Sequence, residues 1–167
     1  MKLISHRGNI NGRIPLRENE PAYVDLAILS GYDVEVDIRQ DSNGIFSLGH
    51  DESQYEVTYE WLTQRANVLW IHCKNIEALG WFNKQTLTNS AQFIRSSFRY
   101  FWHEEDDYTL TSCGKIWTYP NKKLYTNSIC VMPEKGFEGD ISMCYGVCSD
   151  YVKEYNKWCN MEGIRII

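Results

Sequence analysis

The sequence predicts a single α/β domain, because segments typical of strands and of helices alternate along it without an internal boundary. Residues 32–39 alternate apolar and charged side chains, which is the periodicity of a strand. Residues 20–30 place apolar side chains at helical spacing. No repeat, low-complexity tract or flexible linker divides the 167 residues, so we expect one domain over residues 1–167 with one core.

The elements of the first half follow in order. A short strand is expected at residues 3–5, then an irregular loop rich in glycine and proline, and then the helix at 20–30, with Gly31 as its C-cap. The strand at 32–39 comes next. Turn residues after it predict a hairpin whose second arm is residues 45–48.

The second half continues the alternation with weaker patterns. Further strands are expected at residues 68–74, 98–103, 115–119, 128–132 and 147–149. Helices are expected at residues 75–84 and 151–159, and the polar stretch 84–97 is expected to be a loop with a short helix. The resulting α/β sheet can be open or closed.

Composition excludes several classes of protein. The net charge of −5 gives no broad basic face, so we expect neither nucleic-acid binding nor stable association with a membrane. Six cysteines are few for a disulfide scaffold of this length, and no apolar run approaches the roughly 20 residues of a spanning helix. We therefore expect a soluble, reduced, cytoplasmic protein.

Two strands carry side chains suited to a metal site. Glu35 and Asp37 lie two apart and project from the same face of their strand, as do His72 and Lys74 on a later one. Paired carboxylates repel each other, and a hard divalent cation relieves that repulsion. The alternative is a solvated acidic face on an edge strand.

Two histidines favour the metal site over the solvated face. His6 directly follows the first strand and His50 directly follows the hairpin arm, at strand ends where α/β folds place their sites. Histidine titrates near neutral pH, so a pair can supply one general acid and one general base.

Several motifs, in order, resemble those of the glycerophosphodiester phosphodiesterase family. The resemblance is dense over residues 4–75 and sparse beyond them. The matching segments are His6-Arg7-Gly8, Glu18-Asn19, Glu35-x-Asp37, Asn43-Gly44 and His50-Asp51, with weaker matches at Lys74, Trp117-Thr118 and Gly146-Val147-Cys148-Ser149-Asp150.

The resemblance implies a TIM-type β/α barrel that hydrolyses a small phosphodiester with one divalent ion, Mg²⁺ or Ca²⁺ first and Mn²⁺ next. It implies that His6 and His50 are the catalytic acid and base, in an order that the sequence leaves open. Arg7 and Lys74 are expected to bind the phosphate. In this family the nucleophile can be a neighbouring hydroxyl of the substrate.

The chain departs from the family pattern at one metal ligand. Where the family usually carries a glutamate two residues before the strand lysine, this chain carries His72. Imidazole suits Mn²⁺ or Zn²⁺ better than Ca²⁺, so either His72 alters the metal or ligation rests on Glu18, Glu35 and Asp37. Cys73 points to the opposite face and is expected to pack under a helix.

The length is a second departure, because a full (β/α)₈ barrel takes about 250 residues. We therefore expect a reduced or incomplete barrel, with dimerisation as one way to cover an exposed wall. His103 or Glu105 is a candidate for the ligand that His72 replaces, and Glu134 is another candidate site residue. Trp117 and Tyr119 either line a substrate pocket or belong to the core. The spacing of Cys144 and Cys148 is poor for zinc.

Rival functions remain at this point. A non-catalytic protein that binds a phosphate ligand on the same barrel is the main alternative, motivated by His72 and the short chain. Phospholipase-type relatives share the site but act on membrane lipids, for which no docking segment is evident. An unrelated barrel isomerase or aldolase would leave the pair of histidines unexplained.

Overall fold

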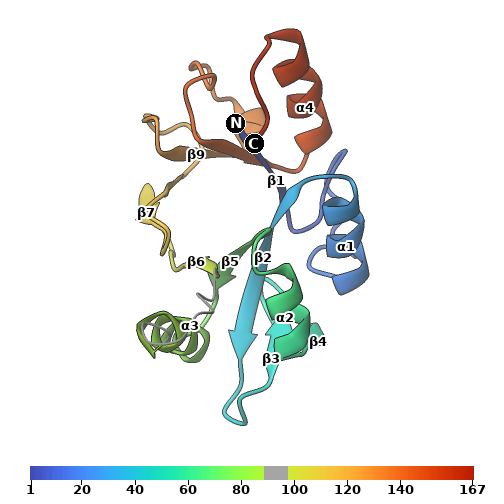
Figure 1. Ribbon diagram of the computed structural model, residues 1–167, viewed down its shortest axis with the longest axis vertical. Coiled ribbons are helices and arrows are strands. Elements are labelled where there is room, and N and C mark those ends of the chain that lie inside the picture. Colours follow the sequence, from blue (N-terminus) through green and yellow to red (C-terminus); the bar gives the residue numbers. More distant parts are fainter. Residues whose placement is uncertain (89–97) are drawn as a thin grey trace.

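A ten-stranded mixed sheet organises the molecule, with helices packed on its outer side (Figure 1). The computed structural model describes residues 1–88 and 98–167. Its elements are β1 (Lys2–His6), α1 (Pro21–Leu29), β2 (Asp33–Gln40), β3 (Phe46–Leu48), β4 (Tyr55–Val57), α2 (Tyr59–Arg65), β5 (Leu69–Cys73), α3 (Ile76–Thr88), β6 (Arg99–Phe101), β7 (Tyr108–Leu110), β8 (Ile116–Thr118), β9 (Ser128–Val131), the 3₁₀ turn η2 (Pro133–Lys135), β10 (Gly146–Ser149) and α4 (Val152–Met161).

Parallel strands form the centre of the sheet. In the described part of the chain they are hydrogen-bonded in the order β6-β5-β2-β1-β10-β9-β8, and β7 adds to β8 in the antiparallel sense. The antiparallel arms β3 and β4 extend from the far end of β2. In Figure 1 the strands follow a curve from β9 through β1, β2 and β5 to β6 and β7.

The two ends of the curved sheet, β6 and β7, are joined through hydrogen bonds of Ser112. Ser112, just after β7, donates its backbone N–H to the carbonyl of Tyr100 in β6, and its hydroxyl accepts from the Tyr100 N–H. These contacts take the place of a strand ladder between β6 and β7 in the described residues.

Apolar side chains form one cluster inside the curve and two outside it. Between the sheet and helices α1, α2 and α3, the alternate residues Val34, Val36 and Ile38 of β2 pack with Phe82. A second outer cluster lies between the sheet and α4. The inner cluster consists of Ile4, Trp70, Phe101, Trp117, Ile129, Val131 and Cys148. Alternation along each strand thus separates an outer from an inner face.

The predicted α/β class is confirmed, and most expected elements are present within a few residues of their predicted ends. The solvated-edge interpretation of the 32–39 strand is wrong, because β2 lies between β1 and β5 and both its faces are buried. Residues 84–88 belong to α3 rather than to a loop, and residues 89–97 of that prediction lie outside the described residues.

Several short elements were not predicted. They are β4, α2, β7 and η2, none longer than seven residues. Short segments hold too few apolar positions to establish a period. None of the described helices is long and apolar enough to cross a bilayer.

Helix α2 begins at an N-cap residue, Thr58, although its apolar residues show no clear helical period. The hydroxyl of Thr58 accepts a hydrogen bond from the backbone N–H of Trp61, 3.1 Å away, which is an N-cap. We expect Thr58→Ala to lower the free energy of unfolding by about 1 kcal/mol, with Thr58→Ser retaining most of it. Urea titration of these variants checks this, with Thr63→Ala inside the same helix as the control. Equal losses at positions 58 and 63 would contradict the cap.

Candidate functional site

Strand register brings an acidic pair and a histidine together on the inner face of the sheet. Asp37 of β2 is the register partner of His72 in β5, and Glu35 is the register partner of His6 in β1. Glu35, Asp37 and His72 each offer one ligand atom, and these atoms lie within 4.8 Å of one another. The inner apolar cluster adjoins this group, since the Phe101 ring stacks on His72.

The two carboxylates are buried at a high electrostatic cost. Glu35 is 2% exposed and Asp37 is fully buried, and an unpaired buried charge is expensive. Burial, together with the neighbouring Asp37 charge, raises the pKa of Glu35 well above its usual range. Burial alone would also raise the pKa of Asp37, but the Arg7 guanidinium and the hydrogen bond from the Asn19 amide hold it well below its usual range.

Two oxygens of this pair accept no hydrogen bond. Among the described residues, Oε2 of Glu35 and Oδ1 of Asp37 are buried without a hydrogen-bond donor. Buried polar atoms are normally satisfied, so such orphans mark a place for a proton or a cation. His72 Nδ1 lies 3.1 Å from Asp37 Oδ1 without the alignment of a hydrogen bond.

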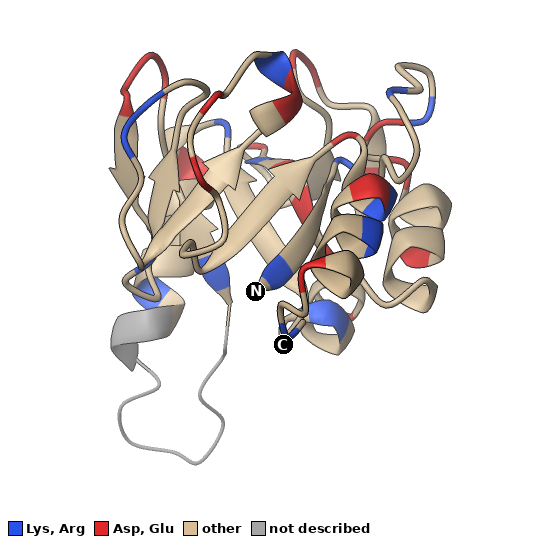
Figure 2. Cartoon of the chain, turned by 90° about the horizontal axis from the view of Figure 1, so that it is seen from above, with Lys and Arg blue, Asp and Glu red and all other residues tan. Residues whose placement is uncertain are grey.

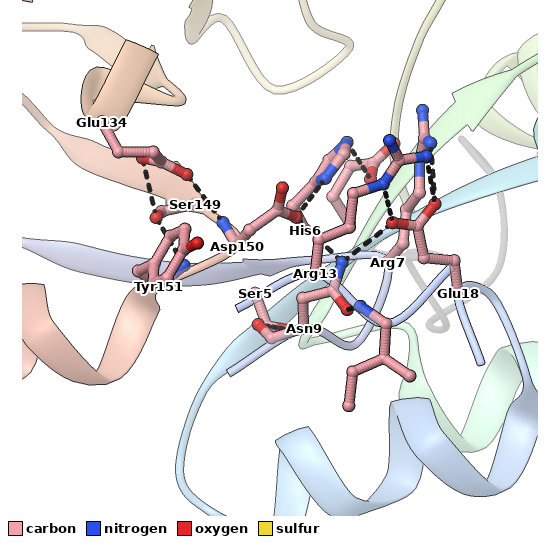
Figure 3. A network of polar contacts seen from close by, with 12 residues as sticks. Ser5, His6, Arg7, Asn9, Arg13, Glu18, Glu134, Ser149, Asp150 and Tyr151 are labelled. Carbon is pink, nitrogen blue, oxygen red and sulfur yellow. Dashed lines mark hydrogen bonds and ion pairs between the residues drawn. The ribbon is translucent and has the colours of Figure 1, made fainter. Parts of the chain in front are cut away.

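His6 is held by an aspartate from the other end of the chain. Its Nδ1 lies 2.7 Å from Oδ1 of Asp150, directly after β10, and its Nε2 lies 3.9 Å from Oε2 of Glu35 (Figure 3). An ionised carboxylate can only accept, so Nδ1 donates to it and Nε2 carries the lone pair. Burial opposes ionisation of Asp150, but the His6 hydrogen bond lowers its pKa.

Glu134 and Asn9 fix Asp150 in turn. The carboxylate of Glu134 in η2 accepts from the backbone N–H of Asp150 and from the hydroxyl of Ser149, while the amide of Asn9 donates to Asp150 Oδ1 at 2.8 Å (Figure 3). Glu134 therefore fixes the position of Asp150, which in turn contacts His6. Glu134 was predicted as a candidate site residue, and in this arrangement it is a positioning residue.

Arg7 contacts both Asp37, which is one of the three possible metal ligands, and Glu18. Its Nε lies 2.8 Å from Asp37 Oδ2 and its Nη1 lies 3.1 Å from Glu18 Oε2. Arg7 has a φ of +53°, a strained value for a residue with a side chain, of the kind found at functional sites. Its backbone N–H donates to the carbonyl of Glu35, and its own carbonyl accepts from Asn19.

Glu18 is surrounded by donors and lies outside the group of three possible ligands. Its oxygens accept from Arg7, Arg13 and Asn9 (Figure 3). Of the two ligand sets that the sequence left open, the structure assembles the one with His72, and Glu18 orients Arg7 instead.

The protonation of Glu18 should make stability depend on pH. Burial opposes ionisation, but hydrogen bonds from Arg13 and Arg7 lower the pKa of Glu18 below its usual value. The folded state then binds fewer protons than the unfolded state at acid pH, so this stability is present above about pH 4.5 and is lost as pH falls through the folded pKa. We expect Glu18→Gln to weaken that dependence in urea titrations from pH 7 to 3. The partly exposed Glu20→Gln is the control, and an equal effect there would contradict the assignment.

His50 is brought to the site by backbone contacts. The guanidinium of Arg39 donates to the carbonyls of His50, Asp51 and Lys74, which ties the loop after β3 to the end of β5. Gly49 precedes it with a φ of +148°, where a Cβ would lie 2.0 Å from the carbonyl oxygen of Glu52. Only glycine fits this close approach.

The neighbouring carboxylate of Asp51 fixes the tautomer of the His50 ring. Its Nδ1 lies 2.6 Å from the carboxylate of Asp51, so Nε2 carries the lone pair when the ring is neutral. Burial and the charge of Arg7 lower the pKa of His50, which keeps the ring neutral at physiological pH.

These side chains line a single cavity of about 560 Å³. Its walls include His6, His50, Arg7, Lys74, Glu35 and His72. Trp117, Tyr119, His103 and Glu105 also line it, so the predicted pocket role of the two aromatic residues is compatible with this structure. In Figure 2 the charged loops gather at the end of the sheet to which the strand arrows point, opposite the two termini.

Sequence reasoning missed two contacts that shape the site. The Asp150–His6 pair joins residues 144 apart, and only the aspartate at the end of the last predicted strand hinted at it. The carbonyl of His103 lies 3.2 Å from His72 Nε2, a backbone contact that no side-chain pattern signals. Cys73, as expected, is buried on the opposite face, and burial raises its pKa to about 12.

The chain matches no protein-family model and no curated protein.

Proposed function

We propose that this chain is a metal-dependent phosphodiesterase that hydrolyses a small phosphodiester, with glycerophosphodiesters as the class implied by its motifs. The observation that carries the proposal is the cavity shared by His6, His50, Arg7 and Lys74 beside the buried group of three possible ligands. Acid and base groups, cations and a metal-binding group are together what diester hydrolysis requires.

The fold supports this proposal as a reduced TIM-type barrel. The parallel strands of such a barrel direct their carboxyl ends, and therefore the site, to one face. Here the site residues lie within or directly after β1, β2, β3, β5 and β10, at one face of the sheet. Between β6 and β9 the described chain contains strands and loops in place of helices, and Ser112 bridges the seam between β6 and β7. Loss of those helices accounts for the short chain.

The cationic side chains are suited to binding the phosphate oxygens. The guanidinium of Arg7 has several N–H donors. Its Nη1 donates to Glu18, and its Nε lies 2.8 Å from Asp37 Oδ2. Arg7 and Lys74 both line the cavity. Burial alone would lower the pKa of Arg7, but the charges of Asp37 and Glu35 raise it above its usual value, so the guanidinium stays charged throughout the working pH range.

The two histidines divide the proton transfers. The Nε2 lone pair of one takes the proton from the attacking hydroxyl, which belongs to water or to the substrate itself. The protonated ring of the other gives its proton to the departing alkoxide oxygen. Asp150 orients His6, and Asp51 orients His50. Each such transfer typically contributes about 10²–10⁴-fold.

The donor set fits a divalent ion. His72 Nδ1 lies 3.1 Å from Asp37 Oδ1 and 3.9 Å from Glu35 Oε1. Two atoms that each lie about 2.1 Å from an ion are at most about 4.2 Å apart, so these separations allow shared ligation. When bound, a divalent ion supplies positive charge that neutralises a phosphoryl oxygen.

An assay of the purified protein tests the proposal. We expect hydrolysis of bis-(p-nitrophenyl) phosphate or glycerophosphocholine that EDTA abolishes and that Mg²⁺, Mn²⁺ or Ca²⁺ restores. The monoester p-nitrophenyl phosphate is the control for a contaminating phosphatase. Turnover that survives chelation would overturn the proposal. Binding of the diester without turnover, with every metal, would overturn it in favour of a non-catalytic phosphate-binding protein.

A further inference from the structure

We infer that the metal site selects a first-row transition-metal dication, of the Mn²⁺, Co²⁺ and Zn²⁺ class, over Mg²⁺ and Ca²⁺, because His72 is one of its three protein ligands. The inference deepens the proposed function, since it concerns the same site. It depends on the three side chains Glu35, Asp37 and His72 and on the contacts around them.

The protons on the His72 ring are arranged for ligation through Nδ1. Its Nε2 lies 3.2 Å from the backbone carbonyl of His103, and a carbonyl only accepts, so Nε2 carries the proton. In a neutral ring, Nδ1 then directs its lone pair at Asp37 Oδ1 and Glu35 Oε1. Histidines that bind metals almost always donate their other N–H to a carbonyl or carboxylate in this way.

The ring cannot easily turn away from that position. His72 is 5% exposed and packs against two other rings. The ring of Phe101 stacks on it with centroids 5.0 Å apart and an interplanar angle of 7°, and the ring of His103 with centroids 4.7 Å apart and an angle of 11°. A ligand held by packing loses little side-chain freedom when an ion binds.

The oxygen donors around this nitrogen are too few for a hard cation. Ca²⁺ takes six to eight oxygen ligands and Mg²⁺ also prefers oxygen, whereas imidazole suits the transition metals. The site offers two carboxylates, and Asp37 Oδ2 is already engaged by Arg7 Nε at 2.8 Å and by the Asn19 amide at 3.0 Å. The orphan oxygens Glu35 Oε2 and Asp37 Oδ1 are both buried and accept no hydrogen bond from the described residues.

The inferred metal preference is tested by measuring metal binding to the full chain after a chelator has removed any bound metal, and no substrate is needed. In calorimetric titrations at pH 7.5 we expect Co²⁺ and Zn²⁺ to bind at least about tenfold more tightly than Mg²⁺ and Ca²⁺. His72→Glu should lower that preference by about 10–100-fold. His103→Gln is the matched control, because it removes the stacked ring and keeps the backbone carbonyl. The preference of this variant for Co²⁺ and Zn²⁺ over Mg²⁺ and Ca²⁺ should stay nearer to that of the wild type.

If the His72→Glu variant fails to fold, a measurement on the wild-type protein still tests the inference. Pulsed electron paramagnetic resonance of the Mn²⁺-loaded protein should show coupling to a directly bound ¹⁴N nucleus, and the coupling should persist in His6→Gln. Absence of the nitrogen coupling, equal affinity for Mg²⁺ and Co²⁺, or no metal binding at all would overturn the inference.

The two proposals fail separately. Selective binding of Co²⁺ or Zn²⁺ by a protein that hydrolyses no phosphodiester would leave the inference standing and overturn the function. Metal-dependent hydrolysis by a protein that binds Mg²⁺ as tightly as Co²⁺ would leave the function standing and overturn the inference.

Discussion

Glu35→Gln is expected to lower kcat/KM for a phosphodiester by about 10³-fold and to weaken metal binding, because it removes one of two carboxylate ligands from a buried site. The substitution keeps the size and shape of the side chain. In the metal-free protein it also removes a costly buried charge next to Asp37, so the free energy of unfolding should not fall. Steady-state kinetics, calorimetry of metal binding and urea titration measure the three quantities.

Two comparisons make this result decisive. Glu56→Gln removes a carboxylate that is exposed on β4 and should leave kcat/KM within a factor of about two, since surface substitutions have small effects. A Glu35→Gln protein that keeps wild-type activity and metal affinity would remove Glu35 from the site. Loss of activity together with a large loss of stability would instead indicate a structural role.

Asp150→Asn is expected to lower kcat by about 10²-fold or more, because it removes the charge that holds His6 in its reactive tautomer. The carboxylate accepts from His6 Nδ1 at 2.7 Å, whereas the amide of an asparagine can donate to that nitrogen instead. His6 would then carry its proton on Nε2, where it faces Glu35 and the cavity. A ring in that state cannot accept a proton from the nucleophile.

The pH dependence separates this role from simple misfolding. In the wild type the pKa of Asp150 is lowered by the His6 hydrogen bond, so the carboxylate is ionised at neutral pH and supports a protonated ring. Asp150→Asn should therefore shift the acid limb of the kcat profile to lower pH while the far-UV circular dichroism spectrum is unchanged. Asp140→Asn, at an exposed turn, is the control. An unchanged pH profile in Asp150→Asn would rule out the positioning role.

The pattern of alternating residues was sufficient to predict much of the fold. Alternation in β2 separates Val34, Val36 and Ile38 from Glu35 and Asp37, and the fold buries these two sets on opposite faces. The helix at 20–30 was also recognisable, since it ends at a serine and a glycine after a run of apolar residues. Short elements such as β7 and α2 were not predicted, because three to seven residues are too few to establish a hydrophobic period.

The sequence by itself determined which side chains are available to the candidate site and which face of each strand carries them. His6, Glu35, Asp37, His50 and His72 were all identified from residue type and spacing. The role of His72 was left open, because spacing along one strand gives no information about the neighbouring strand.

Only the tertiary structure decided which of these groups meet. The β2–β5 register sets His72 against Asp37, the β1–β10 pairing brings His6 to Asp150, and the chain after β6 carries the His103 carbonyl to His72. These contacts join distant segments whose alignment depends on packing of the whole sheet. Local periodicity reports the direction of a side chain, and the partner that it faces is a property of the folded chain.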